Sequence, residues 1–223
     1  EELTTNKKRT GSTIRWLPDL EVFTDIDIPV EYYRDVMKRQ AVVNAGVTFR
    51  LKREVSSGKF ETEDFYYENG IADYVREITE DKALSSVQFW SAERVGRDRE
   101  DKPEYKVQLN IAMCISNKVS LLEYYHNSSF LEFGGSPDNA VKNAMVAQID
   151  AYLKQSGKYT KSDTKIKFQD IADCLILVSS SFSTETSYLN QTKKAITNKF
   201  IQEAMTEFIR HQLEIYFIEN KLE

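Results

Sequence analysis

The longest periodic segment of the chain lies near its C-terminal end and predicts a long amphipathic helix. From Thr192 to about Ile218, apolar residues recur every three or four positions, which places them on one face of an α-helix. Such a helix would be roughly 40 Å long at about 1.5 Å per residue. The apolar positions are Ile196, Phe200, Ile201, Ala204, Met205, Phe208, Ile209 and Leu213.

Two lysines, Lys193 and Lys194, stand at the predicted start of this helix. A helix N-terminus carries unpaired N–H groups and a partial positive charge, so it favours acidic residues over basic ones. One interpretation is that the helix start, the Gln191 amide and a lysine ammonium together hold an anion such as a terminal phosphate. The alternative is that both lysines are simply solvated. This short motif does not decide between the two.

The strand patterns indicate a sheet beneath the helices. Residues 105–115 place an apolar side chain at every second position, and residues 120–125 are expected to be the antiparallel neighbour of that strand. The continuous apolar run at 174–178 predicts a central buried strand. Residues 87–94 are a further strand. A hairpin is predicted from 47–52 and 60–67 around a Ser-Ser-Gly turn.

Helix signals alternate with these strands. Pro29 begins one predicted helix and Gly70 another, and Ser136 is the expected N-cap of a third, with Pro137 at its first position. Gly134-Gly135 before this third helix could mark a phosphate loop, but the signal is weak without a following Gly-Lys-Ser/Thr sequence. A single strand at 11–17 has no obvious partner. The order of elements predicts an α+β fold in which helices pack on one face of a mixed sheet.

Composition limits the classes of function. The net charge is −5, so any contact with DNA has to be local. Cys114 and Cys174 lie in apolar runs and are expected to be buried, reduced thiols, and two histidines without clustered cysteines do not predict a zinc site. No apolar run approaches the roughly 20 residues that span a bilayer, and no signal peptide is visible, so a cytoplasmic protein without a membrane partner is expected.

Five segments, taken in order, resemble one domain of the ATPase subunit of bacterial type IIA topoisomerases. These subunits are DNA gyrase B and its topoisomerase IV counterpart, and the domain, the second of the subunit, is called the transducer. None of these segments is decisive alone. They are 10–19 (TGSTIRWLPD), 44–51 (NAGVTFRL), 67–71 (YENGI), Gly134-Gly135 before a helix, and Gln191-Thr192-Lys193.

The resemblance implies a ribosomal-protein-type split β-α-β fold with a left-handed crossover. Residues 1–20 would be the end of a preceding GHKL-type ATPase domain, including its last strand, and residues 21–223 the transducer. By the same resemblance, Lys193 contacts the γ-phosphate of ATP with Gln191 beside it, and Thr192 shapes or caps the loop. Lys142 would face the DNA. The loop at 191–193 is expected to be exposed and mobile in this chain.

The resemblance also implies the cofactor and the partners. The chain starts without a methionine and is expected to be a fragment of a longer parent enzyme. ATP with Mg²⁺ would be bound mainly by a domain absent here, so no cofactor and no turnover are expected of this fragment alone. The implied partners are double-stranded DNA, a gyrase A-like protein and a second copy of the ATPase subunit. The alternative is a non-catalytic dimerisation or DNA-capture module of a mismatch-repair-like GHKL protein.

The chain departs from the family pattern at three places. Ser136-Pro137 replaces the usual Thr-His after Gly-Gly, 172–174 (ADC) replaces Arg-Glu-Gly, and Asn190 replaces a small residue before Gln191. These changes indicate a divergent member. The sequence does not separate supercoiling from decatenation.

Overall fold

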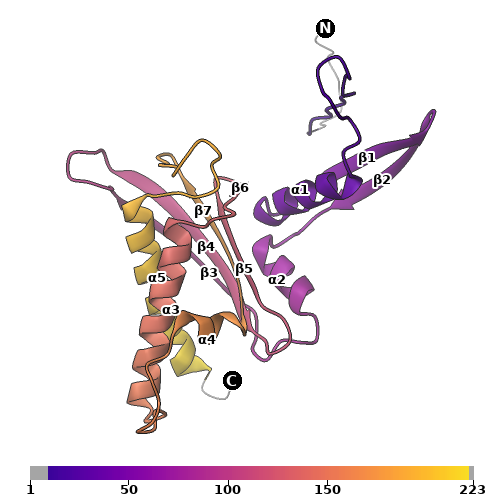
Figure 1. Cartoon of the computed structure of the whole chain (residues 1–223). Helices are drawn as coiled ribbons and strands as arrows, with labels where there is room; N and C mark the ends of the chain where they lie inside the picture. Colours follow the sequence, from indigo (N-terminus) through magenta and orange to yellow (C-terminus); the bar gives the residue numbers. More distant parts are fainter. Residues whose placement is uncertain (1–9, 221–223) are drawn as a thin grey trace.

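The computed structural model describes residues 10–220, which form a five-stranded mixed sheet, a separate hairpin and the helices around them (Figure 1). The helices are α1 (Val30–Val43), α2 (Ile71–Thr79), α3 (Ser136–Gln155), α4 (Phe168–Ala172) and α5 (Lys199–Glu219). The strands are β1 (Phe49–Ser56), β2 (Lys59–Phe65), β3 (Gln88–Gly96), β4 (Tyr105–Ile115), β5 (Leu121–His126), β6 (Ser129–Phe130) and β7 (Leu175–Ser183).

The large sheet has the strand order β3-β4-β7-β5-β6. Strand β4 is antiparallel to both β3 and β7, whereas β5 and β7 are parallel. Parallel neighbours need a crossover connection, and the chain between β5 and β7 contains β6, α3 and α4. The predicted α+β class with a mixed sheet is therefore confirmed.

The predicted pairing of 120–125 with 105–115 was wrong, because β7 lies between β4 and β5. Four consecutive side chains of β7 are fully buried, from Leu175 to Val178. A strand that is buried on both faces belongs in the middle of a sheet, with neighbours at both edges. The prediction that this run is the central strand was right, and its position there separates β4 from β5.

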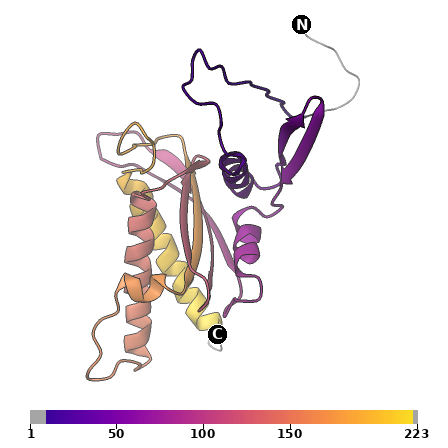
Figure 2. The ribbon, with the colours of Figure 1, turned by 45° about the vertical axis from the view of Figure 1, so that its right-hand side comes forward.

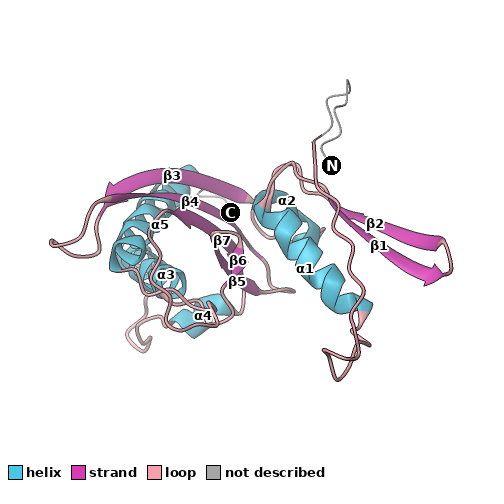
Figure 3. Ribbon diagram, turned by 90° about the horizontal axis from the view of Figure 1, so that it is seen from above, coloured by secondary structure: helices cyan, strands magenta, loops and turns pink. Residues whose placement is uncertain are grey.

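The long helices α3 and α5 pack side by side on one face of the sheet (Figures 1 and 2). Their buried residues, such as Val141 and Met205, join the inward-facing Leu109 of β4 in one core. Helix α2 covers one end of the opposite face, where Val75 and Val178 belong to a second core (Figure 3). The prediction that helices pack on one face thus holds for the two longest helices, while α2 lies on the other face.

Strands β1 and β2 form the predicted hairpin, which projects beyond α1 (Figure 1). Arg34 of α1 reaches Glu63 of β2 at 2.6 Å, which ties the helix to the hairpin. The other end of α1 is buried, since Ala41 and Val42 belong to the second core together with Val178 of β7. Helix α1 therefore connects the hairpin to the large sheet.

Two predicted details were wrong. Residues 11–17 do not form a strand, and Ile14 and Leu17 are exposed. The expected lack of a partner within residues 10–220 explains this, because a strand is held in place by its neighbour. Helix α3 has Gly135 rather than Ser136 at its N-cap, which places Pro137 at the second helical position. Pro still fits there, because the first N–H groups of a helix have no partner within it.

Candidate functional site

The loop between β7 and α5, residues 184–198, carries the two lysines that the sequence places at a helix start. Helix α5 begins at Lys199, with Asn198 as its N-cap, rather than at Thr192. Lys193 and Lys194 therefore precede the helix, and the prediction that they stand at its N-terminus was wrong. Lys193 lies in the loop with a φ of +57°, a conformation that residues other than glycine adopt rarely.

Backbone hydrogen bonds to other segments keep residues 194–197 out of the helix and prevent an earlier helix start. The carbonyl of Lys194 accepts from the N–H of Phe133 at 2.9 Å, and that of Ile196 accepts from the N–H of Ser136 at 2.9 Å. Ile196 is fully buried, so it satisfies the apolar pattern without being helical. Further bonds of this kind join Leu189 to Ala195 at 2.9 Å and Thr197 to Ser187 at 2.7 Å.

The start of α5 is capped by a residue from the distant connection between β3 and β4. The carboxylate of Asp98 accepts from the backbone N–H of Phe200 at 2.8 Å and from the side-chain amide of Asn198 at 2.8 Å. Asn198 in turn accepts from the N–H of Ser187 at 2.8 Å through its side-chain oxygen. The helix and the loop before it are thus fastened at the same point.

The tip of the loop is exposed, as predicted, at Gln191, Thr192 and Lys193. Asn190 shapes it, since its side-chain oxygen accepts from the hydroxyl of Thr192 at 2.5 Å and from the N–H of Thr192 at 3.1 Å. The Nζ atom of Lys193 lies 5.5 Å from the centroid of the Tyr188 ring. Within the described part of the chain, neither Lys193 nor Gln191 has an ionic partner or a side-chain hydrogen bond.

Lys194 differs from Lys193 because its ammonium is paired with a carboxylate of this chain. Its ammonium forms an ion pair with Glu132 and lies 5.7 Å from the centroid of the Phe133 ring. Only Lys193 of the two therefore offers an ammonium without a carboxylate partner among residues 10–220. Lys193 and the Gln191 amide could together contact one phosphate group, but they are too few to hold a nucleotide alone.

Lys142, the predicted DNA contact, lies on α3 and belongs to a different region. Its Nζ atom is 2.6 Å from the carboxylate of Asp138 and 5.8 Å from the centroid of the Phe168 ring. The side chain is 45% exposed. Lys142 can reach a phosphate at the surface, but part of its charge is balanced by Asp138.

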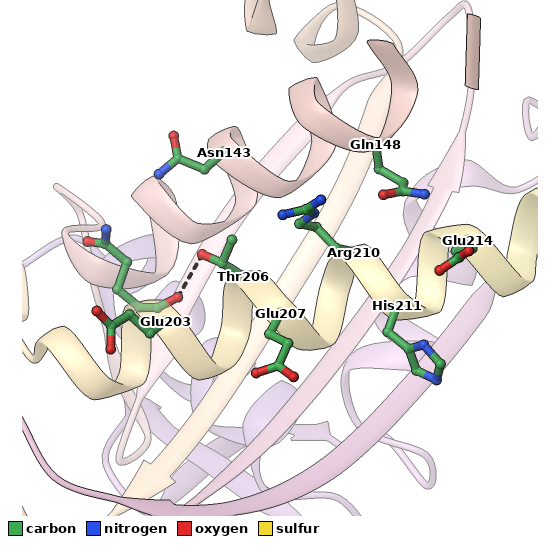
Figure 4. A pocket seen from close by; sticks show the side chains of 9 residues that line it. Asn143, Gln148, Glu203, Thr206, Glu207, Arg210, His211 and Glu214 are labelled. Carbon is green, nitrogen blue, oxygen red and sulfur yellow. Dashed lines mark hydrogen bonds between the residues drawn. The ribbon is translucent and has the colours of Figure 1, made fainter. Parts of the chain in front are cut away.

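An open groove of about 570 Å³ lies between α3 and α5 and was not found from the sequence (Figure 4). Three glutamates of α5, Glu203, Glu207 and Glu214, line it beside Arg210 and His211. The residues that line the groove are polar positions of two helices. From the sequence alone such positions indicate only a solvated helix face, so they do not reveal a groove.

His126 is a buried polar residue that the sequence analysis also missed. It is fully buried at the end of β5, and its ring nitrogens lie 2.8 Å from the hydroxyl of Ser181 and 2.8 Å from that of Thr186. Burial lowers its pKa to about 4, so the ring is neutral at neutral pH. A single histidine beside an apolar strand carries no sequence signal for such an arrangement.

The described residues contain no other cluster of side chains typical of a catalytic or metal-binding site. Residues 10–220 include no group of three or more histidine, cysteine or acidic side chains placed to hold a metal ion. None of the helices between residues 10 and 220 combines the length and the apolar character needed to cross a bilayer. Both cysteines are free thiols, and Cys114 is buried, as predicted, whereas Cys174 is only half-buried.

Comparison with known proteins matches this chain to one family model and to related bacterial proteins. The family model "DNA gyrase B" matches residues 70–223. A DNA gyrase B protein of Mycoplasmoides gallisepticum is 25% identical over 227 residues, which cover 99% of this chain and 34% of that protein. This chain therefore spans about a third of the length of that relative.

Two solved structures share the fold. One is the 43K ATPase domain of Thermus thermophilus gyrase B in complex with an aminocoumarin, with a TM-score of 0.65, 16% identity, and coverage of 92% of this chain and 52% of that one. The other is a topoisomerase IV ATP-binding domain of Francisella tularensis in complex with a small-molecule inhibitor, with a TM-score of 0.66, 19% identity, and coverage of 91% and 52%.

Proposed function

The chain belongs to the DNA gyrase B family, and on this basis we propose that it is the transducer region of the ATPase subunit of a type IIA DNA topoisomerase. The observation that carries the proposal is the exposed loop tip, where Lys193 has no carboxylate partner among the described residues while the adjacent Lys194 is paired with Glu132. The left-handed backbone of Lys193 supports this assignment, because strained residues cluster at functional sites. The family match does not favour the mismatch-repair-like alternative.

In this proposal Lys193 is a phosphate sensor. Its ammonium, with the Gln191 amide beside it, contacts the terminal phosphate of an ATP molecule that residues outside this chain bind together with Mg²⁺. A phosphate oxygen attracts the ammonium strongly in a site from which water is excluded, and the attraction weakens once the terminal phosphate has been released. The loop would then be free to leave the nucleotide.

The anchors of the loop would pass this change to the rest of the chain. The segment directly after Lys193 is bonded to Phe133 and to Ser136 at the start of α3, and Asn198 lies at the start of α5. A displacement of the loop therefore acts on the ends of both long helices. Such a coupled movement of packed elements is a common way in which a local charge change alters the arrangement of domains.

DNA and protein partners follow from the same proposal. Lys142 on α3 would contact the phosphate backbone of a captured duplex without reading its sequence. The parent enzyme would contain two copies of this chain and a gyrase A-like partner. Because Lys142 is also paired with Asp138 at 2.6 Å, its contribution to DNA affinity should be small.

The transducer in this proposal starts after residue 20, and the preceding residues complete an ATPase domain. The packing supports this division, because Ala41 and Val42 of α1 share the second core with Val178 of the large sheet. The segment at 10–19 is by contrast exposed almost throughout. The first nine residues of the proposed 1–20 segment lie outside the described part of the chain.

The proposal is tested by ATP turnover of the parent enzyme with and without the Lys193 ammonium. A Lys193→Ala variant should fold normally and hydrolyse ATP far more slowly. Unchanged turnover would show that Lys193 does not contact the phosphate.

A further inference from the structure

The turn between β5 and β6 consists of two residues, Asn127 and Ser128, with φ values of +47° and +61°. Positive φ at both central positions is typical of the type I′ hairpin turn, and Asn is one of the residues that tolerate it. The turn presents polar groups to both sides. One side faces the start of the loop at 184–198, and the other faces α1.

Toward the loop, the side chains of His126 and Asn127 both contact Thr186. The hydroxyl of Thr186 lies 2.8 Å from Nε2 of His126 and accepts from the side-chain amide of Asn127 at 3.2 Å. The same amide of Asn127 donates to the carbonyl of Ser183 at 3.0 Å, and its oxygen accepts from the N–H of Ser183 at 3.0 Å. The turn thus continues the pairing of β5 with β7 and extends it into the loop.

Toward α1, the turn is held by two polar contacts. The side-chain amide of Gln40 donates to the carbonyl of Ser128 at 2.9 Å, and the hydroxyl of Ser128 donates to the side-chain oxygen of Asn44 at 3.4 Å. Since α1 is packed into the second core, its contacts fix the turn independently of the loop at 184–198. The turn therefore provides a rigid base for Thr186.

The path from Thr186 to Lys193 is short. Ser187 is bonded to Asn198, and the next residue, Tyr188, carries the ring that lies 5.5 Å from Nζ of Lys193. Tyr188 also forms a bridge with Ile196, which closes the loop. Thr186 therefore joins Asn198 and Ile196 as an anchor of the chain on either side of Tyr188, whose ring lies beside the lysine.

We propose that Thr186 is a positioning residue, held by His126 and Asn127, that fixes the loop in the position from which Lys193 contacts phosphate. This inference rests on the proposed function of Lys193. Thr186 does not touch the nucleotide in this account and acts only through the loop. If Thr186 is replaced, Nε2 of His126 loses its partner at 2.8 Å and keeps only the hydroxyl of Ser183 at 3.4 Å, so residues 185–188 can shift. A shift of about 1 Å in a positioned group can cost about a hundredfold in rate.

The test is a double-mutant cycle on ATP turnover of the parent enzyme, with Thr186→Val, Lys193→Ala and the double variant. Thr186→Val should lower the turnover number by about tenfold or more. In the Lys193→Ala background the same change should have no further effect, because Thr186 acts only through Lys193. Thr186→Ser should restore turnover, and Thr160→Val, a matched change in the exposed loop after α3, should leave it unaltered.

A second measurement uses the 223-residue chain itself and needs no nucleotide. In Thr186→Val, hydrogen exchange of the amides at 187–194 should become faster, while exchange in β4 and in the middle of α5 stays as in the wild type. A merely structural role would speed exchange throughout the chain. If the variant unfolds, Asn127→Ala provides the same test through the other partner of Thr186.

The outcomes separate this inference from the proposed function. If Lys193→Ala leaves turnover unchanged, the proposed function fails. If Lys193→Ala lowers turnover but Thr186→Val does not, or if the two effects multiply in the double variant, the positioning role of Thr186 is overturned while the proposed function stands.

Discussion

The α-carbon of Gly135 lies so close to the carbonyl oxygen of Ile196 that a Cβ atom at this position would be 2.2 Å from it. This contact joins the start of α3 to the segment before α5. It also accounts for the second glycine of the Gly-Gly pair, which serves close backbone packing and a φ of +82°. Gly135 therefore does not need a phosphate to explain it.

Gly135→Ala should destabilise the fold strongly. The added Cβ atom would collide with backbone, which cannot move away as a flexible side chain can, so we expect a loss of at least about 3 kcal/mol in the free energy of unfolding. Gly58→Ala is the matched control, since Gly58 has a φ of +75° and nothing within 4 Å of its Cβ position. It should cost only about 1 kcal/mol. Equal losses in urea unfolding of the two variants would contradict the close contact.

The burial of His126 predicts that the stability of the fold depends on pH between 6.5 and about 4. Burial lowers its pKa from 6.5 to about 4, so in this range the unfolded chain binds a proton that the folded chain does not. The contribution of His126 to stability is therefore complete above pH 6.5 and is lost as the pH is lowered toward 4. Between about pH 7 and pH 5 the loss should be about 2 kcal/mol.

Urea unfolding of His126→Gln and His211→Gln checks this prediction. Carboxyl groups also titrate as the pH approaches about 5, so the quantity to compare is the difference between each variant and the wild type. The first variant should lose the part of the pH dependence that His126 contributes, and the second is the control that makes the same substitution at an exposed histidine. A fall in His126→Gln as steep as in the wild type would contradict the assignment.

Lys142 should contribute one weak contact to DNA. In binding of a short duplex by the parent enzyme, Lys142→Ala should reduce the slope of log affinity against log salt concentration by up to about 1. Lys154→Ala is a close control that should leave the slope unchanged, because Lys154 is paired with Asp150 on the same helix at the same spacing and distance, 2.6 Å, as Lys142 with Asp138. An equal reduction for the two lysines would show that Lys142 has no special role.

The sequence was most informative where one local pattern determines the structure. Strand β4 was predicted with its observed limits because its alternation continues along the whole strand. The apolar face of α5 from Ile201 to Leu213 was predicted because each of its residues packs on the same core. The hairpin of β1 and β2 followed from its turn residues. In these cases local preference and tertiary packing agree.

It was least informative where distant segments compete with a local pattern. Ile196 fits the helical period, yet its bond to Ser136 and its β-bridge with Tyr188 keep it out of the helix, which begins only where Asp98 caps it. The position of β7 between β4 and β5 depends on pairing across the sheet, which periodicity does not encode. The role of Lys193 came from resemblance and stays a prediction, to which the structure adds that Lys193 lacks the ion pair that Lys194 has.

The most direct test of the phosphate-sensor role is steady-state ATP turnover of the parent enzyme with Lys193→Ala, beside Lys199→Ala as a control. Lys199 is also exposed, and its ion pair in the described part of the chain is with Glu203 at 3.5 Å. We expect turnover to fall by at least about tenfold in Lys193→Ala, with the midpoint of thermal unfolding unchanged, and to stay at the wild-type level in Lys199→Ala. Wild-type turnover in Lys193→Ala would contradict the account.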